Sequence, residues 1–199
     1  MPLGVDASLY PFIRAAKRVD EPVVTLIGSM HWYPGYSAAR RLLTRLWPRI
    51  KARVPNARLQ IVGWNACKML HEFRALPDVV VQENVADTGP YFERTSVFLY
   101  APERGSGMKV KILEAMAYGV PVVTTSEGVE GLPAVDGEHA GISETDAGLV
   151  ERTVRLLRDP RAQNRQRIAA RQLVQRHCGP AQTLDGVEAM YDRMVHEQA

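Results

Sequence analysis

Residues 104–132, RGSGMKVKILEAMAYGVPVVTTSEGVEGL, join a glycine-bearing loop, a helix and a buried strand in one uninterrupted segment. Residues 108–118 contain no Gly, no Pro and no β-branched run, so they predict a helix that Gly119 ends at its C′ position. Residues 121–125, PVVTT, form a short β-branched run between turn residues, which is typical of an interior strand of a parallel sheet. The segment therefore predicts one loop–helix–strand unit of an α/β fold.

The same alternation of strand and helix patterns continues on both sides of this segment. Strands are predicted at 23–28, 58–63, 79–82, 97–100 and 121–125, with a short further strand near 140–143. Helices are predicted at 36–54, 65–75, 88–95, 108–118, 145–158, 160–176 and 180–197. Such alternation predicts a doubly wound, Rossmann-like parallel sheet with flanking helices on both faces and a helical C-terminal segment.

The loop before the central helix is suited to an anion. Gly105, Ser106 and Gly107 stand just before the helix N-terminus, where the first backbone N–H groups lack intrahelical partners and the helix dipole is positive. Both features favour a bound phosphate. Three nearby cations add positive charge: Arg104, Lys109 and Lys111.

One carboxylate interrupts the otherwise apolar helix at 108–118. Lys111, Glu114 and Tyr118 are spaced by three and four residues, so they lie on one line of the helix. A carboxylate in a mostly buried helix needs a partner. Periodicity leaves two alternatives: Glu114 pairs with Lys111 on an exposed face, or it binds a ligand. The remaining positions are apolar or small and predict little solvent exposure: Val110, Ile112, Leu113, Ala115, Met116 and Ala117.

Loops after two of the predicted strands carry the other candidate residues. Glu130 lies in a glycine-flanked loop after strand 121–125, at the carboxyl edge where open α/β sheets place their ligand sites. Gly28 and Ser29 end the first strand. His31, Trp32 and Tyr33 follow them. We expect these residues to line a cleft, with simple loop packing as the alternative for His31.

At this point the sequence resembles a known family. KILEAMAYGVPVVTT followed by EGVEGL is similar to the donor-binding half of the GT-B glycosyltransferases, in particular the large retaining group called glycosyl transferases group 1, or family 4. PLGVD at 2–6 resembles that family's interdomain joint. VTLIGSM at 24–30, with Pro34, and PNARLQIVG at 55–63 resemble its first two strands. The resemblance covers the chain from its start to about residue 160.

The resemblance implies roles for the positions that match. Glu114 matches the family's glutamate that hydrogen-bonds the ribose hydroxyls of the nucleotide, which the two oxygens of a carboxylate can accept. Residues 105–108, ending at Met108, match the loop whose amides approach the phosphates and sugar of the donor. Val85 follows the third predicted strand, where the family places backbone contacts to the base, and Glu130 lies near the same pocket.

Two positions depart from the family pattern. Members usually carry a second glutamate, for the donor sugar, eight residues before the ribose-binding one, and here that position is Ser106. They also supply an arginine and a lysine from the loop after the first strand, and residues 29–33 contain neither. This leaves Arg104, Lys109 and Lys111 as candidates to stabilise charge on a departing diphosphate. The resemblance implies neither a metal nor another cofactor.

Length and composition are compatible with one domain. A chain of 199 residues that is 46% hydrophobic can bury one substantial core. By resemblance, residues 1–13 would be the interdomain joint, 14–143 the Rossmann-like nucleotide-sugar-binding domain, and 144–199 a helical segment packed on it. A complete enzyme of this type holds a second domain. We therefore expect this chain to be the C-terminal half, inactive alone, with its own N-terminal acceptor domain as partner.

The surroundings of the domain are predicted from apolar and charged runs. No stretch approaches the roughly 18 apolar residues of a transmembrane helix, and no signal sequence is visible, so a cytoplasmic location is expected. Residues 151–176 carry eight arginines against two acids. Such a run is usually a solvated face, with contact to an anionic membrane surface as the alternative. Without interleaved aromatic residues, nucleic acid is not expected, and two isolated cysteines indicate neither a disulfide nor zinc.

The resemblance thus predicts the donor half of a retaining glycosyltransferase, of hexosyltransferase type, that takes its sugar from a nucleoside diphosphate sugar. Two alternatives stay open. A nucleotide-sugar epimerase on the same fold would need acid and base groups converging on the sugar. A receiver-type binding module would need an acidic cluster after the first strand, where Gly28, Ser29 and Met30 stand.

Overall fold

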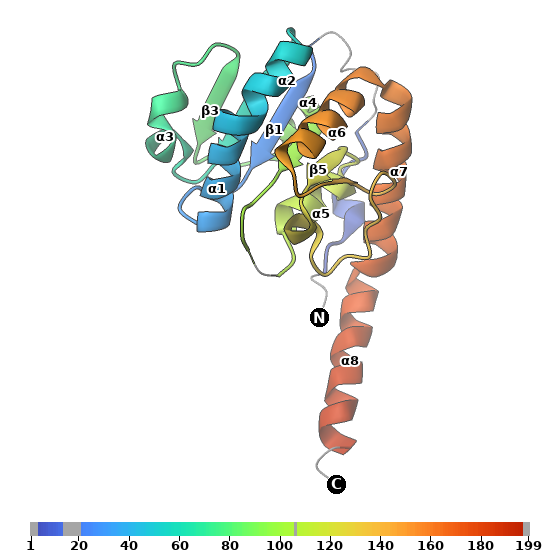
Figure 1. The fold of residues 1–199 in the computed structure, drawn as a ribbon. Coiled ribbons are helices and arrows are strands. Elements are labelled where there is room, and N and C mark those ends of the chain that lie inside the picture. Colours follow the sequence, from blue (N-terminus) through green and yellow to red (C-terminus); the bar gives the residue numbers. More distant parts are fainter. Residues whose placement is uncertain (1–3, 14–20, 106, 197–199) are drawn as a thin grey trace.

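A parallel sheet forms the centre of the molecule (Figure 1). The structure is a computed structural model that describes residues 4–13, 21–105 and 107–196. Within these residues the sheet has six strands in the order β3-β2-β1-β4-β5-β6. Their bounds are Val23–Ile27 (β1), Arg58–Gly63 (β2), Val79–Glu83 (β3), Val97–Tyr100 (β4), Val122–Thr124 (β5) and Gly141–Ile142 (β6). The predicted Rossmann-like architecture is confirmed.

The central strands are buried because helices cover both faces of the sheet. Every residue of β4 is buried, as are all but the first residue of β1. Such strands read as continuous apolar runs, which is why the sequence pattern located them well. β1 pairs in parallel with β2 on one side and with β4 on the other, from Val24↔Val97 onward.

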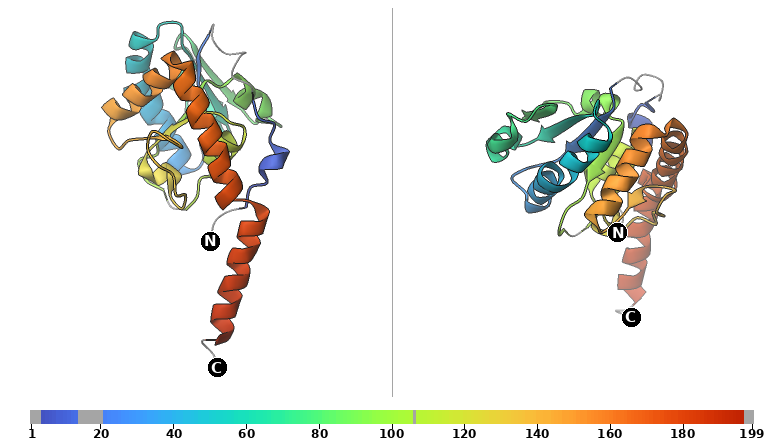
Figure 2. Two further views of the ribbon diagram at one scale, coloured as in Figure 1. Left: turned by 90° about the vertical axis from the view of Figure 1, so that its right-hand side faces the viewer. Right: turned by 45° about the horizontal axis from the view of Figure 1, so that its top comes forward.

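The helices are divided between the two faces. The helices α1 (Tyr33–Arg41), α2 (Trp47–Arg53) and α6 (Asp146–Arg158) lie in front of the sheet in Figure 1, and α4 (Gly89–Arg94) lies behind it. The right-handed crossover from β4 to β5 puts α5 (Val110–Ala117) on the same side as α4. There α7 (Pro160–His177) packs against α5, and α8 (Pro180–His196) projects away from the domain (Figure 2).

Two predicted helices differ from the observed ones. The helix expected at 36–54 starts earlier, at Tyr33, and has a wider π-helical turn at Leu42–Leu46. Pro48 has no N–H to donate to the preceding turn, and the amide of Trp47 reaches back to the carbonyl of Leu42 instead. The helix expected at 65–75 is only α3 (Ala66–Met69) followed by a 3-10 turn, because the backbone of Leu70 leaves the helical region.

The end of α5 agrees with its sequence. Gly119 adopts φ +70°, its amide donates to the carbonyl of Met116, and the amide of Val120 donates to the carbonyl of Ala115. This pair of bonds is the Schellman motif that glycine permits at C′. One helix position was predicted wrongly: Val110 is exposed, because it stands at the open first turn, whereas Ile112 and the other apolar residues of α5 are buried.

The arginine-rich stretch 151–176 is not one solvated face. Arg152 pairs with Asp136 through two hydrogen bonds of 3.0 and 2.6 Å. Arg167 is buried and donates to the carbonyl of Gly119 at 3.1 Å. Arg171 donates to the carbonyls of Ala7, Tyr10 and Ala117 and so ties the N-terminal segment to the end of α5. Part of this charge is therefore used inside the fold.

Candidate functional site

The sheet changes winding direction between β1 and β4. From β1 the chain continues to β2, and from β4 it continues to β5 on the opposite side. The loops that follow these two neighbouring strands therefore diverge and leave a crevice at the carboxyl edge of the sheet. In open α/β proteins this switch point is where ligands bind.

A pocket lies at this switch point. The loop after β1 contributes Gly28, Ser29 and Trp32 to it, and the start of α5 contributes Met108, Lys109 and Lys111. The remaining lining residues are Ile27, Pro34, Tyr100 and Val110. The structure thus brings together six residues that the sequence predicted from two separate segments: Gly28, Ser29, Trp32, Met108, Lys109 and Lys111.

Close backbone contacts shape the floor of the pocket. The amide of Gly28 donates to the carbonyl of Val62 at 3.0 Å, and that of Met30 donates to the carbonyl of Trp64 at 3.0 Å. A Cβ at Gly63 would stand 1.6 Å from the carbonyl oxygen of Gly28. The ends of β1 and β2 can approach this closely only because Gly63 has no side chain, so this glycine supports the crevice from below.

Lys109 is fixed by contacts with the glycine-bearing loop before α5 and with the loop after β5. Its ammonium donates to the carbonyl of Gly107 and lies 3.6 Å from Oε2 of Glu130, with 10% of the side chain exposed. On the same side, a Cβ at Gly131 would stand 2.9 Å from Cγ of Met108. The loop after β5 therefore packs on the loop before α5.

Lys111 and Glu114 form an ion pair one turn apart on α5. Nζ of Lys111 lies 2.6 Å from Oε2 of Glu114, and their side chains are 35% and 15% exposed. That oxygen is itself buried and accepts no hydrogen bond of regular geometry from any residue that the structure describes. The sequence alternative of a Lys111 pair is thus present, but with a carboxylate that is mostly covered. Glu114 thus carries a negative charge next to the pocket without a full set of hydrogen bonds.

Two phenols lie near this carboxylate. Burial raises the pKa of Tyr118, and the negative charges of Asp87 and Glu114 raise it further. Burial also raises the pKa of Tyr10, again with a smaller contribution from Glu114. The rings of Tyr10 and Tyr118 meet edge to face at 5.1 Å. Glu114 therefore has a lysine and two neutral phenols in its electrostatic surroundings.

The aromatic loop after β1 contributes differently from what was expected. Trp32 lines the pocket with 69% of its surface exposed, whereas His31 is exposed and is not among the lining residues. The hydroxyl of Tyr33 donates to Oε2 of Glu103 at 3.2 Å and so links this loop to the one after β4. Sequence reasoning did not select Tyr100, whose position at the end of β4 was the available signal.

The other predicted residues are dispersed. Arg104 is exposed on the loop between β4 and α5, next to Gly105. Ser106 lies outside the described residues. Val85 lines a different groove, with Gln60, Gln82 and Tyr91, on the β2–β3 side of the sheet. The predicted contact of Val85 with a base stays a prediction.

Within residues 4–13, 21–105 and 107–196, no three His, Cys, Asp or Glu side chains gather as a metal site would require. Over the same part of the chain, no helix has both the length and the apolar character needed to cross a membrane.

Comparison with known proteins places this site in context. Residues 21–159 match the family described as glycosyl transferases group 1. None of the curated proteins has a significantly similar sequence. Sucrose-phosphate synthase from Thermosynechococcus elongatus has a similar structure, with a TM-score of 0.74 at 18% identity over 98% of this chain and 52% of that one.

Two further solved structures have the same fold. HepE from Anabaena, in complex with UDP-glucose, gives a TM-score of 0.75 at 14% identity over 96% of this chain and 56% of its own. The C-terminal domain of a glycosyl transferase group 1 family protein from Francisella tularensis gives 0.67 at 16% identity, over 89% of this chain and all of that domain. The chain thus spans about half the length of the synthase and of HepE.

Proposed function

Because the chain belongs to the glycosyl transferases group 1 family, we propose that it is the donor-binding domain of a retaining hexosyltransferase. The donor is a nucleoside diphosphate sugar, and the acceptor binds to another domain of the full-length protein. The observation that carries the proposal is the pocket at the switch point, where the loop after β1 meets the cationic start of α5. HepE, which shares the fold, was solved with UDP-glucose, a ligand of this class.

Residues in and beside the pocket bind different parts of the donor. Lys111 and Arg104 neutralise the diphosphate, and Lys109 holds the loop that approaches it. Negative charge grows on the phosphate oxygens as the nucleoside diphosphate departs, so fixed cations beside them lower the barrier. Glu114 accepts hydrogen bonds from the ribose hydroxyls. The pair between Lys111 and Glu114 separates when the donor enters, since both groups then have a partner of their own.

The rest of the reaction depends on positioning. In this proposal no metal takes part and no side chain of this domain acts as a nucleophile, because the acceptor attacks from the face that the diphosphate leaves. Holding two substrates in line supplies much of the rate acceleration. The domain alone should therefore bind the donor without transferring its sugar.

The acceptor domain has surfaces available to it. The helix α8 projects beyond the sheet edge that carries the pocket (Figure 1), and Leu184, Met190 and Tyr191 are exposed along it. Trp32 and Trp64 are exposed at the same edge of the sheet. Apolar groups in such numbers favour a covering partner. We propose that the N-terminal domain of the full-length protein covers them. We also propose that the protein is cytoplasmic and makes peripheral contact with a membrane.

A thermal-shift panel of nucleoside diphosphates tests the proposal, since a ligand that binds only the folded state raises Tm. We expect one base to stabilise the domain, and the matching nucleoside to do so less. Absence of stabilisation by every nucleoside diphosphate and every nucleotide sugar would exclude donor binding. Transfer of sugar by the isolated chain would instead contradict the assignment of the acceptor site to another domain.

A further inference from the structure

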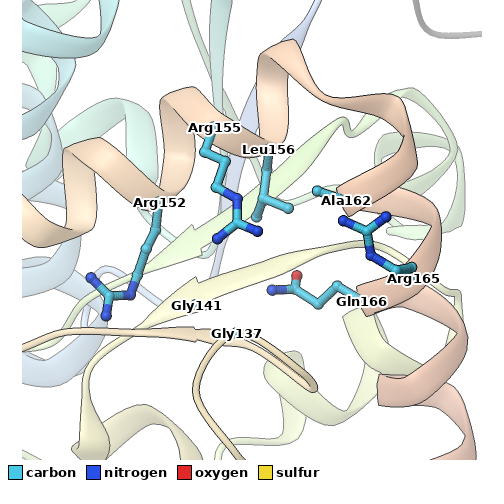
Figure 3. Close-up of a pocket in the computed structure, with 8 residues that line it drawn as sticks. All are labelled: Gly137, Gly141, Arg152, Arg155, Leu156, Ala162, Arg165 and Gln166. Atoms are coloured by element: carbon cyan, nitrogen blue, oxygen red, sulfur yellow. The ribbon is translucent and has the colours of Figure 1, made fainter.

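A second pocket lies between α6, α7 and the edge strand β6 (Figure 3). Its walls carry three arginines, one on each of two successive turns of α6 and one on α7: Arg152, Arg155 and Arg165. Gly137 and Gly141 form its floor, and Gln166 closes one side. None of these residues lines the pocket at the switch point.

The three arginines differ in their partners. Arg152 is committed to Asp136, with both oxygens of that carboxylate engaged. For Arg155 and Arg165, no carboxylate of the described residues lies within ion-pair distance. In Figure 3 both guanidinium groups face the same space. Both residues are exposed, so water screens part of the repulsion between their charges, and an anion between them would compensate the rest.

The acids near these two arginines are already engaged. Backbone hydrogen bonds from Ala162 and Arg161 lower the pKa of Asp159, and the charges of Arg165 and Arg155 contribute less. Oδ1 of Asp159 accepts from both of those amides and caps α7. Asp159, a carboxylate that both guanidinium groups influence, therefore serves to cap the helix.

Gln166 is the buried polar residue of the pocket. The residue is 4% exposed, and its Oε1 accepts a hydrogen bond from the amide of Val122 at 3.0 Å, which orients the side chain. Its amide nitrogen consequently points into the pocket (Figure 3). Among the described residues, none accepts a hydrogen bond from that nitrogen. Unlike Glu114 Oε2, Thr125 Oγ1 and Arg167 Nη2, this nitrogen is not enclosed by protein, so it is open to the pocket and can donate to a ligand there.

We propose that this pocket binds a phosphate group, held by Arg155, Arg165 and the amide of Gln166. Guanidinium groups match the geometry of phosphate oxygens and form strong, charge-assisted hydrogen bonds with them. The bound group belongs either to a soluble phosphate compound or to a lipid headgroup at the membrane surface. In both cases the site is separate from the donor pocket and does not depend on the function proposed for it.

Titration with inorganic phosphate, followed by amide NMR at fixed ionic strength, tests the site directly. We expect saturable shifts of the Gln166 side-chain amide and of Gly137 and Gly141, with chloride producing none. Replacing both cations, Arg155→Gln with Arg165→Gln, should weaken phosphate at these signals by at least about tenfold. Arg74→Gln with Arg176→Gln removes the same charge from exposed positions elsewhere and should leave the affinity unchanged.

Sedimentation with phosphatidylcholine vesicles, with and without phosphatidic acid, separates the two sources. Saturation by free phosphate without vesicle binding assigns the pocket to a soluble ligand. Binding to phosphatidic acid vesicles that the Arg155 and Arg165 pair of changes removes, and the control pair does not, assigns it to a lipid. The proposal is overturned if the pocket signals respond to neither, or if both pairs of changes reduce binding equally.

Discussion

Nζ of Lys111 and Oε2 of Glu114 lie 2.6 Å apart beside a pocket that faces solvent. The two residues have opposite charges. In the proposed function they bind different parts of the donor: the lysine binds phosphate oxygens and the carboxylate binds ribose hydroxyls. The ion pair keeps both charges compensated in the ligand-free domain. Replacing one partner therefore leaves the other without its counter-charge. If the two residues bind different parts of the donor, the two variants should lose affinity for different ligands, which variants of a purely structural pair would not do.

The first prediction separates these two roles. Lys111→Met should weaken the nucleoside diphosphate by about tenfold while leaving the nucleoside unchanged, because only the phosphates lose a charge-assisted bond. Glu114→Ala should weaken both ligands, because the ribose is common to them. Calorimetric titration of the two ligands measures this, with the exposed Lys68→Met as a charge-matched control. Equal losses of both ligands in Lys111→Met would contradict phosphate contact.

The second prediction concerns the floor of the pocket. Gly63→Ala would place a Cβ 1.6 Å from the carbonyl oxygen of Gly28, and neither backbone can move without opening the β1–β2 pair. We expect a loss of about 2–3 kcal/mol in the free energy of unfolding. Gly105→Ala is the control, since the atoms nearest to its Cβ would be side-chain atoms of Lys109 and Pro34, at 3.3 Å and beyond. Similar stability of both variants in urea would show that the floor is not tight.

The third prediction compares two arginines of α7. Arg171 donates to three backbone carbonyls from separate segments, whereas Arg167 donates to one and leaves Nη2 buried without a partner among the described residues. Replacing an incompletely satisfied charge by a similar apolar side chain is less harmful than removing a fully bonded one. Arg171→Met should therefore lower the unfolding free energy by about 2–3 kcal/mol, and Arg167→Met by less. A larger loss in Arg167→Met would show that its stacking over Phe12 dominates.

The fourth prediction is a pH dependence at the switch point. Burial raises the pKa of Tyr100 to about 12 from its ordinary value of 10.0. The unfolded chain ionises this phenol first, so its contribution is complete below pH 10 and is lost as pH rises toward 12. The loss is at most about 3 kcal/mol. Urea unfolding across this range should be steeper in pH for the natural protein than for Tyr100→Phe, and parallel curves would contradict the burial of this group.

Local patterns were sufficient for most elements of this fold. The apolar runs gave the bounds of β2 and β4 correctly, and Gly119 ended α5 as predicted, because these signals act within a few residues. These local signals failed where tertiary packing decides the backbone conformation. Leu70 is drawn into the core and breaks the helix expected at 65–75, and Pro48 produces a π-helical turn whose type no periodicity reveals.

The amino-acid sequence alone was enough to identify the family, the parallel sheet and the two segments that meet at the candidate site. It left open how the charges there are shared. Only the folded chain shows that Lys111 pairs with Glu114 and Lys109 with Glu130, and that Val85 belongs to another groove. It also divides one arginine-rich stretch between internal bonds and a pocket that contains Arg155 and Arg165. The reason is physical: periodicity is a property of neighbours along the chain, whereas compensation of charge depends on distance in space and on burial.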